Sequence, residues 1–140
     1  MNKQSNVYTI IYIIVLVVVV GAALALTSMS LHDRQQANAD ADKMRQILAS
    51  VHLSAPTSEI GTEFDRYITS QYIVDESGAI VSDNGAFSVD VAAQSKVEPA
   101  KRKLPVYECT LAAGDVKYIV PLYGAGLWGP IWGYVAFNSD

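Results

Sequence analysis

The sequence of 140 residues is poor in the side chains that build disulfide frameworks and metal centres. Cys109 is the only cysteine, so neither an intrachain disulfide nor a thiolate metal cluster can form. The only histidines are His32 and His52, and three such side chains are too few for the usual four ligands of a structural zinc ion. We therefore expect no metal site.

Positive charge is also scarce. Ten Lys and Arg residues stand against fourteen Asp and Glu residues, which gives a net charge of −4. The only dense basic cluster is Lys101-Arg102-Lys103. Proteins that bind nucleic acid need a basic stripe to neutralise phosphates, so we expect no nucleic-acid partner.

The sequence also lacks a catalytic constellation for acyl transfer or hydrolysis. Cys109 lies in a strand pattern, which predicts a buried small hydrophobe rather than a nucleophile. His52 follows a predicted helix end, where a solvated role is expected. The carboxylate pairs at residues 59 and 63 and at residues 75 and 76 lie in exposed helix or turn settings. The sequence does not offer a general base together with a group that orients it and a donor that stabilises an oxyanion. We therefore predict no catalytic residue.

One long apolar run dominates the amino-terminal part of the chain. Between Val7 and Leu26, 18 of 20 residues are apolar and none is charged. A helix of this length rises about 30 Å, the thickness of a hydrocarbon core. Its Val, Ile and Leu side chains favour insertion by about 4 to 8 kcal/mol in total. We therefore predict a single transmembrane helix over residues 7–26, preceded by a tail of residues 1–6.

A cleaved secretory signal is the alternative. Lys3 supplies a charged start, and Ala23-Leu24-Ala25 has the form of a cleavage site. Signal cores usually run for about 7 to 15 residues, and this run is longer. The length therefore favours a retained anchor. Both interpretations send the rest of the chain across the membrane.

Residues 27–55 are predicted to form a helical connector. Apolar side chains recur along one helix face at Ala41, Met44, Leu48 and Val51. This face predicts that the last turns of the helix pack on a folded domain. The helix must end by Ala55, because Pro56 lacks a backbone donor and disfavours helical geometry in the residue before it.

Residues 56–140 are predicted to form a short helix and then a run of strands. Thr62 and Asp65 resemble a capping box, with Asp in place of Glu. From Gln71 the apolar period changes to two. The predicted strands are residues 72–74, 79–81, 87–91, 106–111, 116–120 and 131–137, with residues 94–103 as a surface loop. Helices followed by strands predict an α+β domain with an antiparallel sheet.

The last predicted strand contains Tyr134-Val135-Ala136-Phe137, which has the composition of a buried strand, yet only three residues follow it. We therefore expect residues 56–140 to be the amino-terminal part of a larger domain, or a domain that another chain completes.

Glycine and tryptophan are concentrated between Tyr118 and Tyr134, where four of the nine glycines and both tryptophans lie. Glycine permits positive φ and close backbone approach, while indoles can stack on a planar ring or fill a core. The spacing does not fit a phosphate-binding GxGxxG motif, because a strand follows here rather than a helix. The residues alone leave a structural turn and a ligand wall both open.

The run Gly124-Ala-Gly-Leu-Trp-Gly-Pro-Ile-Trp-Gly-Tyr134 resembles the GxGLWGxxxGY signature of the C subunit of the sodium-translocating NADH:quinone reductase. Residues 45–48, 84–87, 103–107 and 118–122 are similar to this family in content and order. The single amino-terminal span is also shared, so the resemblance covers essentially the whole chain. The G subunit of the Rnf electron-transport complex is a looser relative that shares the flavin-binding domain.

This resemblance implies an electron-transfer subunit of a complex that oxidises NADH, reduces ubiquinone or menaquinone and pumps Na⁺ from cytoplasm to periplasm. The chain would cross the cell inner membrane once, with residues 1–6 in the cytoplasm and a flavin-binding domain in the periplasm. Its partners would be membrane lipid and the other subunits of the complex. The fold class would be α+β, a transmembrane helix followed by a truncated FMN-binding-type domain.

In this family, FMN is linked through its phosphate to a threonine in a Ser-Gly-Ala-Thr type motif. The chain contains no such motif; the nearest match, Ser77-Gly78-Ala79-Ile80, has no hydroxyl at the last position. The attachment threonine would therefore lie beyond residue 140 in the family, and we expect this chain alone to be inactive and to hold no covalent FMN.

The resemblance implies that Leu127 and Trp128 line or support the flavin pocket, while Gly126 and Gly129, with Gly124, shape the loop. The flavin would carry the redox chemistry and the protein would position it. The alternative from another functional class is a membrane-anchored extracytoplasmic binding or assembly module without a redox role. In that case residues 124–134 form only a structural turn.

Overall fold

The computed structural model describes residues 6–140, so Lys3 and most of the predicted tail over residues 1–6 lie outside the described residues. The chain divides into two units, one up to Asp40 and one over Ala41–Asp140. Helix α1 (Asn6–Ala49) contributes to both units. It runs through the predicted span over residues 7–26 and most of the predicted connector over residues 27–55.

The first unit is the exposed part of α1. The most apolar window of this helix has a mean hydropathy of 3.0, and none of it is buried within the described residues. By length and composition, α1 is the one helix of the described chain that could cross a membrane. A helix satisfies its own backbone hydrogen bonds, which lipid requires. An amino-terminal signal sequence would share these properties, so the choice of a retained anchor stays a prediction.

The second unit begins with the last two turns of α1. The helix ends at Ala49, before the limit that Pro56 imposes. His52 adopts a left-handed φ of 62°, and the backbone N–H of Leu53 donates to the carbonyl oxygen of Leu48 over 3.0 Å. The His52 side chain is exposed, as the sequence predicts for a residue after a helix end.

A short helix α2 (Ile60–Tyr67) follows. The predicted capping box at Thr62 and Asp65 is wrong, because the helix already begins at Ile60 and places Thr62 inside it. The residue before the helix is Glu59, whose side chain makes no capping hydrogen bond. Ile60 and Phe64 form the buried face of the helix. Burial of this apolar face therefore sets where the helix starts.

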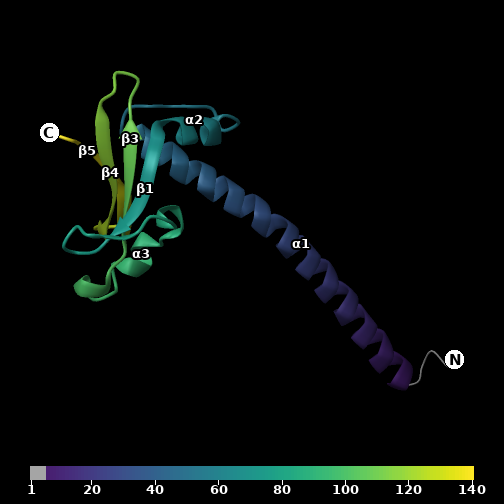
Figure 1. The fold of residues 1–140 in the computed structure, drawn as a ribbon. Helices are drawn as coiled ribbons and strands as arrows, with labels where there is room; N and C mark the ends of the chain where they lie inside the picture. Colours follow the sequence, from purple (N-terminus) through teal and green to yellow (C-terminus); the bar gives the residue numbers. More distant parts are fainter. Residues whose placement is uncertain (1–5) are drawn as a thin grey trace. The chain divides into compact units, whose positions relative to one another are not determined.

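Five antiparallel strands form one sheet in the order β2-β1-β3-β4-β5 (Figure 1). The strands are β1 (Ile68–Val74), β2 (Ile80–Ser82), β3 (Leu104–Thr110), β4 (Val116–Ala125) and β5 (Pro130–Asn138). The predicted α+β class with an antiparallel sheet is confirmed. The predicted β3–β4 hairpin closes through Gly114, whose φ of 85° favours glycine.

The predicted strand over residues 87–91 is wrong. Residues Ala86–Ser88 form the 3₁₀ turn η1, and Val91–Gln94 form the short helix α3. Gly85 enters the first turn with a φ of 84°, and the Asp90 carboxylate accepts from the Ala93 N–H over 3.1 Å to begin the second. A second 3₁₀ turn, η2 (Pro99–Lys101), interrupts the predicted loop.

The core lies on one face of the sheet. Alternation in β3 buries Pro105, Tyr107 and Cys109, while Val106 and Glu108 between them are only partly covered. Ile47 and Leu48 of α1 and Ile119 of β4 belong to the same buried cluster. The predicted helix face containing Leu48 and the predicted burial of Cys109 are therefore confirmed.

The predicted burial of the last strand is only partly right. Tyr134, Val135 and Ala136 are half-buried, whereas Phe137 is 55% exposed. The physical reason is that β5 is an edge strand that pairs only with β4 in the described chain. Its alternate side chains also face away from the core, which leaves them accessible.

Candidate functional site

The glycine- and tryptophan-rich segment forms the β4–β5 hairpin. Strand pairing runs from Lys117 with Asn138 to Ala125 with Pro130, which leaves residues 126–129 as the tip. The Gly126 N–H donates to the carbonyl oxygen of Gly129 over 2.8 Å and closes the turn. The structural-turn interpretation of this segment is therefore correct for its backbone.

Gly126 has a steric reason to be glycine. A Cβ at this position would lie 2.6 Å from Ile131 Cγ1 and 2.7 Å from the carbonyl oxygen of Gly129. Gly129 has a φ of 151°, which side chains rarely adopt. By contrast, nothing lies within 4 Å of a Cβ at Gly124. Two of the three loop glycines are thus required by local geometry alone.

The tip presents the two predicted flavin-contacting side chains to solvent. Leu127 is 91% exposed and Trp128 is 96% exposed. Neither side chain packs on a core residue of the described chain. The structure brings Gly126, Leu127, Trp128 and Gly129 together in one turn, but it does not enclose them in a pocket. An exposed indole at this position is available for contact with a ligand or another protein.

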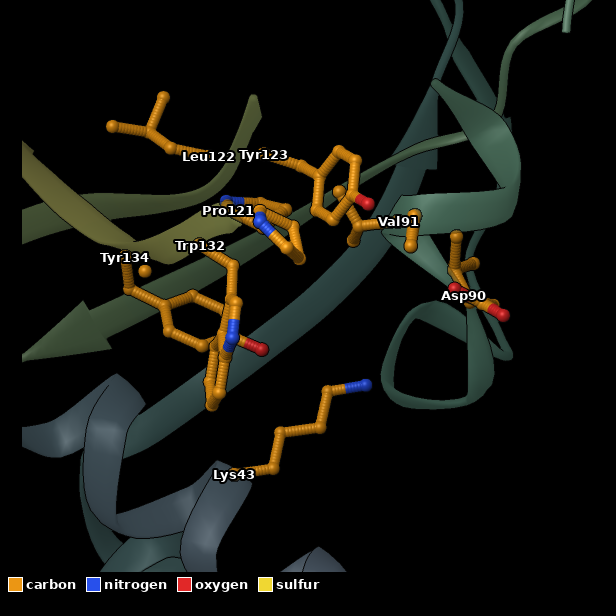
Figure 2. A pocket seen from close by; sticks show the side chains of 12 residues that line it. Lys43, Asp90, Val91, Pro121, Leu122, Tyr123, Trp132 and Tyr134 are labelled. Atoms are coloured by element: carbon orange, nitrogen blue, oxygen red, sulfur yellow. The ribbon is translucent and has the colours of Figure 1, made fainter. Parts of the chain in front are cut away.

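A groove of about 460 Å³ lies beside the stem of the same hairpin (Figure 2). Its sheet side carries Pro121 and Tyr123 of β4 and Trp132 and Tyr134 of β5, while Lys43 and Asp90 lie across from them. Tyr123 and Trp132 are direct cross-strand partners. The alternation of β4 and β5 therefore extends the core face of the sheet into an aromatic wall.

The charged groups of the groove are engaged in the fold. The Lys43 ammonium donates to the carbonyl oxygen of Phe87 and lies 4.6 Å from the centroid of the Phe87 ring. The Asp90 carboxylate caps α3. The wall formed by Tyr123 and Trp132 consequently offers stacking surface rather than acid–base chemistry. The indole of Trp132 is one of the stacking candidates that the sequence offers, whereas Lys43 is not, because only the fold brings it near this ring.

The reactive side chains elsewhere fit a structural role. The Cys109 thiol is buried, and burial raises its pKa, so the reactive thiolate is disfavoured. No group of three or more metal-ligating side chains occurs among residues 6–140. The thiol is therefore best explained as part of the core.

A flavin fits these residues in part. The apolar groove and the Trp128 indole suit a planar ring. No Ser or Thr lines the groove in the described chain, so the only hydroxyls it offers are the phenols of Tyr123 and Tyr134 and not the threonine hydroxyl that the resemblance implies for a phosphoester bond. These surfaces can supply walls of a flavin site, whereas covalent attachment requires a residue from elsewhere.

Comparisons with known proteins agree with the resemblance inferred from the sequence. The chain is 26% identical to the C subunit of the Na⁺-translocating NADH-quinone reductase of Yersinia pestis and 28% identical to that of Vibrio anguillarum, covering 99% of this chain in each case. A crystal structure of the corresponding subunit from Parabacteroides distasonis is similar with a TM-score of 0.70 and 37% identity, covering 79% of this chain. No protein-family model matches the chain.

These relatives are longer than this chain. The match covers 59% of the Yersinia protein and 60% of the Vibrio protein. It covers 52% of the crystallised chain. The chain therefore spans little more than half the length of proteins that it resembles throughout its own sequence and in its fold.

Proposed function

We propose that this chain forms part of an electron-transfer subunit of a sodium-translocating NADH:quinone reductase. The observation that carries the proposal is the combination of 37% identity with a TM-score of 0.70 to the crystallised Parabacteroides distasonis subunit. Similar subunits from several organisms match 99% of the chain, including its apolar helix. Its partners are then the other subunits of that complex, together with membrane lipid around α1.

We further propose that the subunit carries a covalently bound FMN. The threonine that attaches it is not in this chain. When bound, the FMN supplies the redox chemistry for electron transfer from NADH toward ubiquinone or menaquinone. Leu127 and Trp128 contact the flavin from the exposed tip of the β4–β5 hairpin. Gly126 and Gly129 keep the tip compact enough to hold both side chains outward.

The proposal also places the chain in the cell inner membrane, with one pass through α1 and the sheet on the periplasmic side. Na⁺ transport from cytoplasm to periplasm is then a property of the assembled complex. The described part of the span over residues 7–26 carries no ionisable side chain other than the phenols of Tyr8 and Tyr12. It therefore anchors the protein and does not itself relay the ion.

The redox role is tested in the assembled complex with the substitution Trp128→Phe. We expect a shift of the flavin potential and slower quinone reduction, because the indole face is replaced by a smaller ring. Lys96→Gln is a control, since Lys96 is exposed and far along the chain from the tip. Unchanged potential and rate in Trp128→Phe would refute the flavin contact.

The membrane role is tested by alkaline extraction of membranes from cells that express the chain. We expect the protein to stay in the membrane pellet, because α1 presents an apolar surface of mean hydropathy 3.0. Release into the wash, with loss of the residues before the cleavage-like site at Ala23-Leu24-Ala25, would instead establish a cleaved signal. An anchored chain that never joins the reductase complex would favour an assembly or binding module without a redox role.

A further inference from the structure

The pair Asn84-Gly85 combines the two features that allow an asparagine to lose its side-chain amide nitrogen spontaneously. Asparagine is thermolabile, because the backbone nitrogen of the next residue can attack its side-chain carbonyl carbon. A glycine in the next position lacks the Cβ that would otherwise obstruct this attack. Asn84 is the only asparagine in the sequence that precedes a glycine. The chemistry of this pair therefore depends on whether the fold leaves it accessible.

The structure leaves both reacting groups accessible. Asn84 and Gly85 are exposed in the segment between β2 and η1. Within the described chain, the Asn84 side-chain amide makes no hydrogen bond and the Gly85 backbone N–H donates to no acceptor. Nothing lies within 4 Å of the position that a Cβ of Gly85 would occupy. Water can therefore reach the pair, and neither reacting group has to break a hydrogen bond first.

Two other asparagines are held differently and serve as internal references. Asn38 lies inside α1, where the backbone nitrogen of Ala39 belongs to the helical hydrogen-bond ladder. The Asn138 side-chain oxygen accepts from the Lys117 ammonium over 2.9 Å, and a serine rather than a glycine follows it. The fold thus singles out Asn84 as the reactive position.

We propose that Asn84 is a site of spontaneous deamidation and isoaspartate formation. The Gly85 nitrogen forms a bond to Asn84 Cγ, the bond from Cγ to Nδ2 breaks, and ammonia leaves with the proton of the Gly85 N–H. Water then opens the five-membered imide. Attack at Cγ gives aspartate, whereas attack at the backbone carbonyl carbon gives isoaspartate, in which the main chain runs through the former side chain. One water is consumed, one ammonia is released, and nothing is oxidised or reduced.

Isoaspartate lengthens the backbone directly before η1. The added methylene group contributes one C–C bond of about 1.5 Å to the main chain. The Ala86 carbonyl oxygen of η1 accepts from Tyr107 Oη over 3.2 Å. This distance is already longer than the usual range of about 2.5 to 3.0 Å for an O–H···O hydrogen bond. A displacement of η1 on the scale of one bond therefore separates the Tyr107 hydroxyl from its acceptor.

The same turn carries a second connection to the core. The Phe87 carbonyl oxygen accepts from the Lys43 ammonium, and the Phe87 ring makes an edge contact with Phe64 at a centroid distance of 5.7 Å. A displaced η1 weakens these contacts as well. The modification therefore acts beyond its own exposed segment and loosens the attachment of η1 to α1, α2 and β3.

The experiment ages the full chain in lipid nanodiscs and compares it with freshly prepared protein. Peptide mass spectrometry locates the loss of ammonia, and a methyltransferase specific for isoaspartate labels the new carboxylate. We expect modification at Asn84, faster in mildly alkaline buffer because the deprotonated Gly85 nitrogen is the better nucleophile. Asn38 and Asn138 should stay intact. Asn84→Gln is the matched control, because its longer side chain keeps the amide but cannot close the five-membered ring.

Hydrogen exchange then tests the effect on η1. The Ser88 and Val89 N–H groups donate to the carbonyl oxygens of Gly85 and Ala86 over 3.1 and 3.2 Å. In the isoaspartate form, we expect their protection relative to intrinsic rates to fall about tenfold or more. The Leu53 N–H, which donates to an oxygen of α1, is the reference that should not change.

Asn84→Asp separates the new charge from the longer backbone. This variant carries the carboxylate without the added methylene group, so freshly prepared Asn84→Asp should keep the protection of Ser88 and Val89. Equal loss of protection in this variant would show that charge, and not backbone length, disturbs η1.

Three further results would overturn the proposal. Asn84 keeps its amide as long as Asn38 does, or aspartate is the sole product, or the isoaspartate form retains full protection at Ser88 and Val89. None of these readouts involves flavin, NADH or quinone, and the inference does not depend on the proposed redox role. A failure here is therefore distinct from a failure of the proposed function.

Discussion

Tyr107 donates a hydrogen bond from its Oη to the backbone carbonyl oxygen of Ala86 over 3.2 Å, and both residues are fully buried. The bond joins β3 to the turn η1, whose last two residues lie in the strand predicted over residues 87–91. The Tyr107 ring also makes edge contacts with Phe64 and Tyr134, at centroid distances of 6.4 and 6.3 Å. One side chain thus ties a helix, a turn and two strands together.

Removal of this hydroxyl should destabilise the second unit. Tyr107→Phe leaves the Ala86 carbonyl buried without its donor, so we expect the free energy of unfolding to fall by about 1 to 3 kcal/mol. Tyr134→Phe is the matched control, because the Tyr134 hydroxyl makes no hydrogen bond in the described chain; its change should be about 0.5 kcal/mol or less. Urea unfolding of the full chain, followed by near-ultraviolet circular dichroism, measures both. Equal effects of the two substitutions would contradict the assigned role.

The Tyr107 phenol should also make the protein less stable in alkaline solution. Burial, and secondarily the neighbouring Tyr134, raises the pKa of Tyr107 above its usual value of about 10. Above that pH the unfolded chain loses the proton while the folded chain keeps it, so the free energy of unfolding declines as pH rises. The contribution is complete below about pH 10 and is lost as pH climbs through the folded-state pKa.

Denaturation at a series of alkaline pH values checks this sign. Tyr107→Phe should flatten the decline without abolishing it, because burial also raises the pKa of Tyr134. The same slope in the variant and in the unchanged chain would show that Tyr107 is not the responsible group.

The hairpin tip offers a test with an internal glycine control. Gly126→Ala forces a methyl group against Ile131 and the Gly129 carbonyl oxygen, and we expect a loss of about 1 to 3 kcal/mol in the free energy of unfolding. Gly124→Ala meets open space in a strand and should be neutral or stabilising by up to about 1 kcal/mol. Thermal unfolding of both variants measures which substitution destabilises the protein more. The steric explanation fails if Gly124→Ala is the more damaging change.

The β1–β2 turn should become less stable in acid. The Asp75 carboxylate accepts from the Ser77 Oγ over 2.6 Å and from the Ala79 N–H over 3.0 Å. The Ser77 hydroxyl is the largest cause of a lowered Asp75 pKa, followed by the Ala79 N–H. The associated stability is present above the usual Asp value of about 4 and is lost as pH falls through the folded-state pKa. The protection of the Ala79 N–H against hydrogen exchange, measured relative to its intrinsic rate, should therefore fall in acid.

Asp75→Asn is the matched variant for this turn, because it keeps an acceptor oxygen and removes the titration. Its Ala79 exchange, corrected for intrinsic chemistry, should depend less on pH over the same range. An identical pH dependence in both proteins would rule out the carboxylate as the sensor.

Structural features that depend on the local spacing of apolar residues can be predicted from the sequence. The apolar run, the helix face containing Leu48 and the β3–β4 hairpin all follow from local spacing, and each is present. Residues 87–91 were mistaken for a strand because Phe87 and Val89 alternate with polar residues and both pack on the core. The decisive signals were Gly85 and the Asp90 cap, which favour turns over an extended chain.

The candidate site was only partly predictable for a different reason. The tip glycines and exposed rings follow from one contiguous segment, so their grouping could be inferred from the sequence. Lys43 and Asp90 reach the groove from distant segments of the chain. No local sequence pattern predicts that these two residues lie close together. The exposure of Leu127 and Trp128 is likewise set by tertiary packing. Their contact with flavin stays a prediction.

The uninterrupted pairing of β4 with β5 restricts how this gene can change in length. One codon gained or lost within residues 116–125 would exchange the side chains that pack beneath the helices with those on the opposite side of the sheet. The four residues at the tip, 126–129, lie outside the strand pairing, so a length change there leaves the register of both strands intact. Length variation among natural versions of this hairpin should therefore concentrate at its bend and spare its arms.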